Sequence, residues 1–220
     1  METSTTWQLA PHAHATSVDG DVVILDLQRD AYFCLPAAPQ RILLSAGRRS
    51  LVLEDRVLLD ALRAANLVVA DSAADADAAL EPPAPMRSAL MDNFDRPRWR
   101  DLRQAVPIFF DVWSVYRGAG MGTIVRSADR RPGASPILSN ALLRYVADFH
   151  RWAPYAPTSA KCLLRSFMLL RGLRRQGFDA YWVFGVRTWP FHAHCWLQCE
   201  DVVLDEQPDH VRAFTPILVV

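Results

Sequence analysis

The sequence predicts an α+β protein of two domains, and three observations lead to this prediction. Short apolar runs bounded by turn residues fill the first 70 positions, which is typical of strands with short helices between them. From position 98 the apolar residues recur at helical spacing, and strand-like runs follow only near the end. Between these regions, Glu81-Pro-Pro-Ala-Pro85 sustains neither helix nor sheet. We therefore expect domains at residues 1–80 and 98–220, joined by a linker at residues 81–97.

The N-terminal region reads as strands with two helices between them. Residues 22–35 predict a hairpin, because the Asp19-Gly20 turn precedes a continuous apolar run and a second turn divides the segment. Pro36 is expected to open a helix that runs to residue 45, and Ser50 to cap a second, amphipathic helix. The expected outer strands are residues 7–12 and 67–70.

Helices precede strands in the C-terminal region. Three helices are expected: residues 98–117 with a kink at Pro107, a helix from Ser135-Pro136 to residue 152, and residues 160–176, capped by Thr158 or Ser159. The expected strands are residues 180–186, 191–198 and 201–205, with a turn at Glu200-Asp201 between the last two.

Charge and composition exclude several classes of protein. The 220 residues have a formal net charge of zero, with six arginines against eleven acidic residues in positions 1–80. Neither half is basic enough to indicate nucleic-acid binding. No apolar run approaches the length of a membrane span, and the first residues lack a signal-peptide pattern. The four cysteines include no CxxC pair, so we expect a reducing, cytoplasmic setting without a disulfide framework.

Cys162, His194 and Asp205 are the candidate catalytic residues. Cys162 falls in the first turn of a predicted helix, where free backbone N–H groups and the helix dipole favour a thiolate. His194 shares a strand face with His192, and Asp205 ends the neighbouring strand. Each has an ordinary structural explanation: a buried cysteine, a hydrogen-bonded core histidine and a turn aspartate.

Together, these three residues predict nucleophilic catalysis. The order of a helix-borne cysteine, a strand histidine and an aspartate on the next strand is that of papain-like and transglutaminase-like sites. Cys162 would be the nucleophile, His194 its base and Asp205 the group that orients the imidazole. A non-catalytic module that binds metal through Cys162, His192, His194 and Asp205 is the alternative, although no HxxxH or CxxC spacing favours it. No metal or cofactor is therefore expected.

The C-terminal region resembles the B protein of lasso-peptide biosynthesis. The resemblance covers about residues 100–220 and rests on Cys162-Leu-Leu-Arg-Ser166, Leu169-Leu170, Gly177, Phe184-Gly-Val186, Phe191-His-Ala-His-Cys-Trp196, Val203-Leu-Asp205 and Phe214-Thr-Pro216. It implies a transglutaminase/papain-like domain in which a helix-borne cysteine packs on an antiparallel sheet. Cys162, His194 and Asp205 match the proteolytic triad of that family. Cys195 departs from it, since relatives usually have alanine there.

The N-terminal region resembles the PqqD-like leader-recognition domain, a small winged-helix fold. The matching residues are Asp19-Gly-Asp-Val-Val-Ile-Leu-Asp-Leu-Gln28 and Ala31-Tyr-Phe-Cys-Leu35. This resemblance implies that residues 1–80 bind a precursor's leader peptide as an added strand. The two resemblances together imply a leader peptidase whose partners are a ribosomal precursor peptide and an asparagine-synthetase-like lasso cyclase. Acyl transfer to an amine by the same triad remains the alternative reaction.

Overall fold

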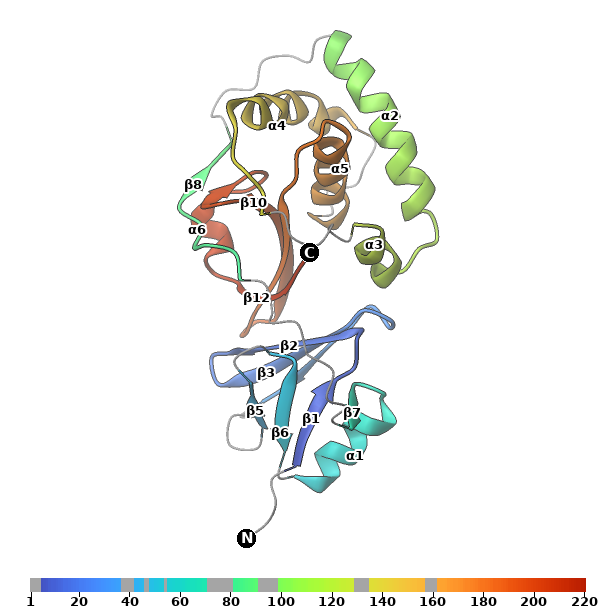
Figure 1. Cartoon of the computed structure of the whole chain (residues 1–220), viewed down its shortest axis with the longest axis vertical. Helices are drawn as coiled ribbons and strands as arrows, with labels where there is room; N and C mark the ends of the chain where they lie inside the picture. Colours follow the sequence, from blue (N-terminus) through green and yellow to red (C-terminus); the bar gives the residue numbers. More distant parts are fainter. Residues whose placement is uncertain are drawn as a thin grey trace.

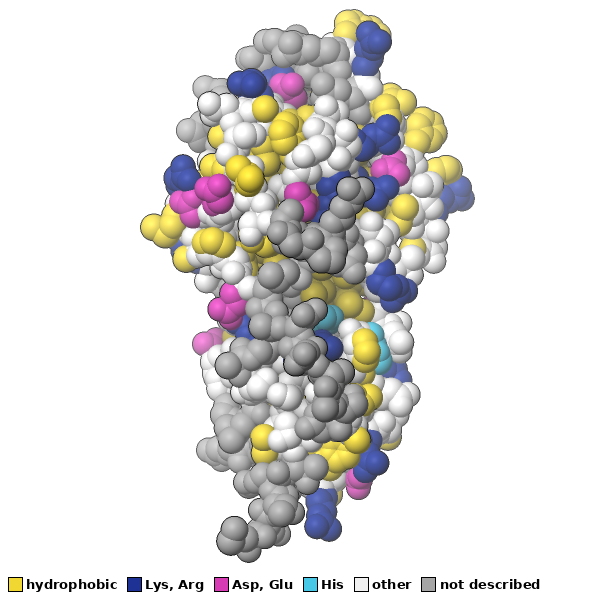
Figure 2. Space-filling view, in the orientation of Figure 1, with side chains coloured by type: hydrophobic (Ala, Val, Ile, Leu, Met, Phe, Trp, Pro, Cys, Tyr) yellow, Lys and Arg dark blue, Asp and Glu magenta, His cyan; other side chains and the backbone are white. Residues whose placement is uncertain are grey.

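A computed structural model of the chain describes residues 5–36, 42–45, 48–53, 55–70, 81–90, 99–128, 135–156 and 162–220. Figure 1 shows two lobes, with the blue N-terminal strands below and the helices and the second sheet above. None of the helices in the described ranges is long and apolar enough to span a membrane. On the face shown in Figure 2, basic and acidic side chains are interspersed over the described surface.

The N-terminal lobe contains two antiparallel sheets and a helix. A four-stranded sheet has the order β5-β6-β1-β7, and a three-stranded sheet has the order β2-β3-β4. The elements are β1 (Thr5–Leu9), β2 (Ala13–Val18), β3 (Asp21–Asp26), β4 (Ala31–Leu35), β5 (Ile42–Leu44), β6 (Ser50–Leu53), α1 (Arg56–Ala64) and β7 (Val68–Ala70).

The expected hairpin of this lobe is confirmed, and the second expected helix is confirmed with a later start. The helix expected from Pro36 to residue 45 is wrong at residues 42–44, while residues 37–41 lie outside the described residues. β3 and β4 pair as a hairpin, with Ile24 opposite Phe33. Residues 42–44 and 50–53 form β5 and β6, because alternate residues of β6 are buried, a period that fits a strand and not a helix. The helix begins later, at Arg56, where the Asp55 side chain accepts the N–H groups of the first turn. The winged-helix fold stays a prediction.

The C-terminal lobe places helices against one mixed sheet of order β12-β9-β10-β11-β8, in which only β8 pairs in parallel. Its elements are β8 (Arg87–Ser88), α2 (Trp99–Tyr116), α3 (Met121–Ser127), α4 (Asn140–Trp152), a 3₁₀ turn (Ala153–Tyr155), α5 (Cys162–Arg175), β9 (Tyr181–Arg187), β10 (His192–Cys199), β11 (Val202–Val203), α6 (Pro208–Val211) and β12 (Thr215–Val219). The three expected helices and three expected strands are confirmed, but α4 begins at Asn140 with Ser139 as its N-cap, not at Ser135-Pro136 as expected. The expected caps of α5, Thr158 and Ser159, lie outside the described residues. β12, β8, α3 and α6 were not predicted.

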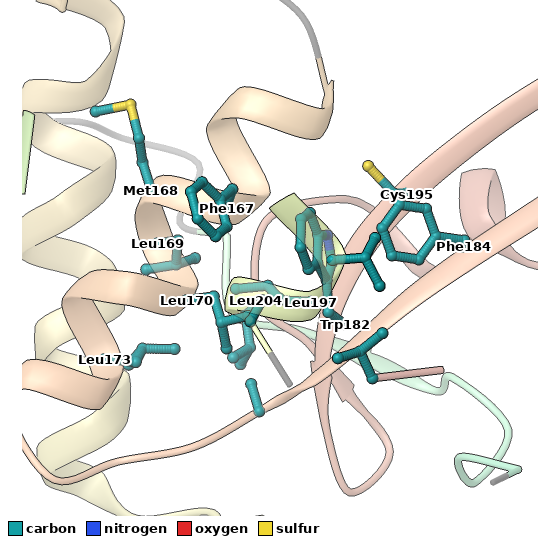
Figure 3. Packing of buried hydrophobic residues seen from close by; sticks show 14 of the residues in the cluster. Phe167, Met168, Leu169, Leu170, Leu173, Trp182, Phe184, Cys195, Leu197 and Leu204 are labelled. Atoms are coloured by element: carbon teal, nitrogen blue, oxygen red, sulfur yellow. The ribbon is translucent and has the colours of Figure 1, made fainter. Parts of the chain in front are cut away.

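The core of this lobe forms where α5 covers the sheet. Figure 3 shows leucines of α5 facing aromatic and aliphatic side chains of β9 and β10. Phe167 stacks on Trp182 with ring centroids 5.5 Å apart, and neither side chain is exposed. Complete burial of such a side chain is worth roughly 1.5–3 kcal/mol. This packing fixes α5, and with it the first residue of the helix, against β10.

Residues 81–90, expected to be part of a linker, run along the sheet of the C-terminal lobe. β8 pairs in parallel with β11. The Gln198 side chain donates to the Pro83 carbonyl at 2.6 Å, and Arg212 donates to the Pro85 carbonyl at 2.9 Å. The prolines exclude helix, as expected, but their free carbonyl oxygens accept hydrogen bonds from the C-terminal lobe. This segment therefore belongs structurally to that lobe.

β3 contributes to the cores of both lobes. All six of its residues are buried. Val23 and Leu25 join the cluster that includes α5 and β9, whereas Val22 and Ile24 join the N-terminal cluster. Alternate residues of a strand point to opposite faces, so a strand between two cores must be apolar on both. This burial of both faces explains why β3 appears in the sequence as a continuous apolar run.

We predict that Leu25→Ala destabilises the C-terminal lobe, although Leu25 belongs to the other half of the sequence. Removing this fully buried side chain should cost about 2–5 kcal/mol in the free energy of unfolding. The measurement is hydrogen–deuterium exchange of α5 and β9, which should be faster in the variant. Leu62→Ala is the matched control, since Leu62 packs only in the N-terminal cluster. Equal protection of α5 in both variants would contradict a shared core.

Candidate active site

The site forms along an edge of β10 that its neighbour leaves open. β11 pairs with β10 only at Gln198 and Cys199. Next along this edge, the Leu197 N–H donates to Asp205 Oδ1 at 2.8 Å. The next N–H that points the same way belongs to Cys195, because backbone groups alternate in direction along a strand. The Cys195 N–H donates to the Cys162 sulfur, so the nucleophile occupies the position that a further strand residue would take.

His194 and Cys195 approach Cys162 from opposite faces of β10. The Cys195 side chain lies in the core beneath α5, whereas His194 lies on the other face, beside Trp196 and Phe214. Both side chains hydrogen-bond to the Cys162 sulfur. The Cys162 sulfur lies at the edge of β10, where side chains from both faces of the strand can reach it. This position explains how the adjacent residues His194 and Cys195 both contact one atom.

The Cys162 thiol is strongly acidified. Hydrogen bonds from the Cys195 thiol and then from His194 lower the pKa of Cys162 from 9.0 to about 4, against an opposing effect of burial. The hydrogen bond with Cys162 and the burial of Cys195 raise the pKa of Cys195, so this thiol stays protonated and acts as a donor. Burial lowers the pKa of His194, but the hydrogen bond with Cys162 and nearby negative charges outweigh it and raise the pKa. A thiolate–imidazolium pair is therefore favoured.

The two ring nitrogens of His194 face different partners. Nε2 lies 3.6 Å from Glu206 Oε2 and has no hydrogen-bond partner among the described residues. The hydrogen bond to Cys162 therefore uses Nδ1. His194 lies nearly parallel to the Trp196 ring, at a centroid distance of 6.3 Å, and Phe214 contacts it at 5.3 Å. These aromatic neighbours restrict the rotation of the imidazole, which keeps Nδ1 directed at the sulfur.

Of the three predicted site residues, the structure brings Cys162 and His194 into contact and places Asp205 beside them. Asp205 is only 8% exposed and accepts the Leu197 N–H, and it has no hydrogen bond to His194 in the described region. Burial raises the pKa of Asp205 to about 7, although His194 and the Leu197 N–H oppose this shift. Glu206, which sequence reasoning missed, is the carboxylate that faces Nε2. No sequence motif indicated that Glu206, as well as the adjacent Asp205, lies close to His194.

A buried histidine of α4 holds the segment that carries both carboxylates. His150 Nε2 donates to the Leu204 carbonyl at 2.8 Å, while Nδ1 accepts from Arg165 at 3.1 Å. Burial lowers the pKa of His150 to about 4, so the ring is neutral and this tautomer is the one that satisfies both contacts. Asp205 follows Leu204 directly, so His150 fixes its position. The sequence offered no sign of this role.

Ser166 supports the start of α5. Its hydroxyl donates to the Cys162 carbonyl at 2.8 Å and accepts from the Trp182 indole at 2.9 Å. The same oxygen lies 3.4 Å from the Cys195 sulfur. One buried hydroxyl therefore links the nucleophile's own residue, the sheet and Cys195. Such a network fixes the first turn of the helix in a low-dielectric setting.

The metal-ligand set considered from the sequence does not assemble in the structure. Among the described residues, the group whose side chains could hold a metal ion consists of His194, Glu206 and His210. His192 is exposed and does not belong to it. The missed ligands, Glu206 and His210, are four residues apart, a spacing that places both on one side of the turn into α6.

A tyrosine of the N-terminal lobe reaches the site. Tyr32, on β4, contacts the Phe191 ring at a centroid distance of 5.5 Å. Burial raises the pKa of Tyr32, and the electrostatic effect of the nearby cysteine pair, Cys195 and Cys162, raises it further. The N-terminal lobe therefore borders the nucleophile as well as the core.

Comparisons with known proteins found a family and one relative to which the chain is similar. The sequence model of a family described as the transglutaminase-like superfamily matches residues 108–219. The chain is also similar to the microcin J25-processing protein McjB of Escherichia coli, with 40% identity over 48 residues. That segment covers 22% of this chain and 23% of McjB. No solved structure matches the chain.

We predict that Cys162 stays reactive in mild acid. With a pKa of about 4, the thiolate is present above that pH and is lost only as the pH falls through it. Iodoacetamide should therefore alkylate Cys162 rapidly at pH 6, as measured by mass spectrometry of the peptides. Cys34 is the internal control, since burial and the nearby Asp21 carboxylate raise its pKa. His194→Ala should slow the alkylation of Cys162 at pH 6. Equal rates at Cys162 and Cys34 would contradict the prediction.

Proposed function

This chain belongs to the transglutaminase-like superfamily, and from that premise we propose that it is a cysteine protease that removes the leader from a lasso-peptide precursor. The observation that carries the proposal is the acidified Cys162 sulfur, held between His194 and the Cys195 N–H. A thiolate paired with an imidazolium is the resting form of a nucleophile ready for acyl chemistry. Asp205 is proposed as the third member of the triad, with Glu206 as a second carboxylate.

The proposed reaction has two steps. The Cys162 thiolate attacks the scissile carbonyl carbon, and the imidazolium of His194 gives its Nδ1 proton to the leaving amine as the C–N bond breaks. A water molecule then attacks the thioester, His194 takes its proton, and the new carboxylic acid and the thiolate are released. The carboxylates near Nε2 stabilise the positive charge on the ring between these steps. The backbone N–H of Cys162 at the helix start is the proposed oxyanion donor.

Leader recognition is assigned to residues 1–80. β7 ends the four-stranded sheet, with Val69 42% exposed and α1 beside it, so an extended peptide could add to the sheet there and contact the helix. The name of McjB describes it as a processing protein for microcin J25, which supports a peptide substrate for this chain as well. A lasso cyclase that receives the cleaved core peptide is the partner we propose.

The same thioester could be attacked by an amine instead of water, which would make the protein an acyltransferase. The family contains this chemistry as its name states. Mass spectrometry of precursor incubated with the protein, with and without a small primary amine, separates the two reactions. We expect free leader and core peptides, and an amide adduct as the main product would overturn the assignment as a protease.

We predict that Cys162→Ala and His194→Ala both abolish cleavage and leave folding intact. Losing either half of a nucleophile–base pair removes most of the rate enhancement. His192→Ala is the matched control on the same strand, because His192 is exposed and has no part in the acidification of Cys162. It should retain most activity. Turnover is measured with a precursor peptide, and cleavage by purified Cys162→Ala would end the proposal.

We predict that Asp205→Asn lowers turnover far more than Glu206→Gln at pH 8. The charge of buried Asp205 acts on His194 with little screening, whereas the Glu206 side chain is 30% exposed. The pKa of Asp205 is about 7, so its carboxylate is ionised at pH 8 and protonated below pH 7. The ratio of wild-type to Asp205→Asn turnover should therefore shrink as the pH falls from 8 to 6. A silent Asp205→Asn with a large loss in Glu206→Gln would transfer the orienting role to Glu206.

A further inference from the structure

The outer side of His194 carries three metal-ligand atoms that the proposed reaction does not require together. His194 Nε2 and His210 Nδ1 lie 3.6 and 3.3 Å from Glu206 Oε2, and all three atoms lie within 4.8 Å of one another. Ligand atoms about 2.0–2.2 Å from a tetrahedral zinc are themselves separated by roughly 3.3–3.6 Å. Two sides of this triangle already have that length.

The surroundings of these atoms also suit a metal ion. His194 Nε2 is buried and has no hydrogen-bond partner in the described parts of the chain, so its lone pair or proton is unsatisfied. The ring of Phe214 contacts both imidazoles, at 5.3 Å for His194 and 5.5 Å for His210. The exposed fractions of the side chains rise from 15% for His194 to 30% for Glu206 and 50% for His210. This gradient gives an ion a route from solvent and leaves room for a water ligand.

We propose that His194, Glu206 and His210 form a binding site for a divalent zinc ion that reversibly inhibits the enzyme. Two imidazoles, one carboxylate and an open fourth position are a ligand set that zinc accepts in proteins. Zinc on Nε2 replaces the proton that the imidazolium carries there. With zinc bound, the ring would hold its Nδ1 proton as a neutral imidazole, which is a much weaker acid than the imidazolium and would transfer that proton to the leaving amine poorly. The inhibitory effect rests on the proposed function, whereas binding of the ion does not.

Binding is tested with the full chain carrying Cys162→Ala, because the thiolate is itself a zinc ligand. Isothermal titration calorimetry with zinc chloride should give one ion per chain. Adding His210→Ala should weaken binding on the order of tenfold or more, since a direct ligand is lost. His192→Ala in the same background is the matched control, because His192 shares the strand but lies outside the group. It should leave the affinity unchanged.

Cobalt(II) provides a second measurement that reports the ligands directly. Its visible absorption in the Cys162→Ala chain should be intense, as for tetrahedral coordination, and should weaken in Glu206→Gln, which keeps the shape of the side chain. Circular dichroism checks that each variant is folded. Zinc binding that is unchanged by both His210→Ala and Glu206→Gln would overturn the site. So would the absence of zinc or cobalt binding to a folded chain.

Inhibition is tested separately in the chain with Cys162 intact. Zinc should slow precursor cleavage, and a chelator should restore it fully. The ratio of rates with and without zinc should move toward one in His210→Ala. If no peptide is cleaved under any condition, the proposed function fails while calorimetry still decides the metal site. If cleavage occurs and zinc inhibits His210→Ala as strongly as the unmodified chain, the inhibitory site is refuted.

Discussion

The geometry of the candidate site depends on where β11 stops pairing with β10. Toward the candidate site, pairing ends at Gln198, and the next two N–H groups along this edge, those of Leu197 and Cys195, are satisfied by the Asp205 carboxylate and by the Cys162 sulfur. If β11 continued along this edge, its backbone would occupy these two positions and the candidate site could not form. Because buried N–H groups must be paired, the edge selects an acidic side chain and a thiolate as partners. The short β11 is therefore what leaves room for the candidate site at this edge of the sheet.

The supporting contacts of the site come from elements distant in sequence. α4 holds the Leu204 carbonyl through His150, and α5 holds its own first turn through Ser166 and Trp182. These are buried hydrogen bonds from rigid helices, so they position the reacting groups more closely than loop contacts do. The chemistry at Cys162 is local, but the precision of its environment comes from the packing of the whole C-terminal lobe.

The elements with strong local signals could be predicted from the sequence. The helix of Cys162 and the strand of His194 were predictable because apolar periodicity marks them. β5 and β6 were misread as helices, since short apolar runs lack a decisive period and tertiary pairing decided their structure. Glu206 and His210 were missed because their approach to His194 depends on the turn into α6. The spacing of these residues along the sequence does not predict how the turn brings them together.

The two-faced burial of β3 limits how this protein can be recombined with its relatives. The boundary that the sequence suggests, near residue 80, leaves a lobe whose β3 still fills the core beneath α5. A chimera joined there would put an unfamiliar strand against the core beneath α5 and replace Tyr32, which contacts Phe191. Exchange of the N-terminal region with that of a relative would therefore have to leave β2, β3 and β4 with the C-terminal lobe and vary the outer sheet alone.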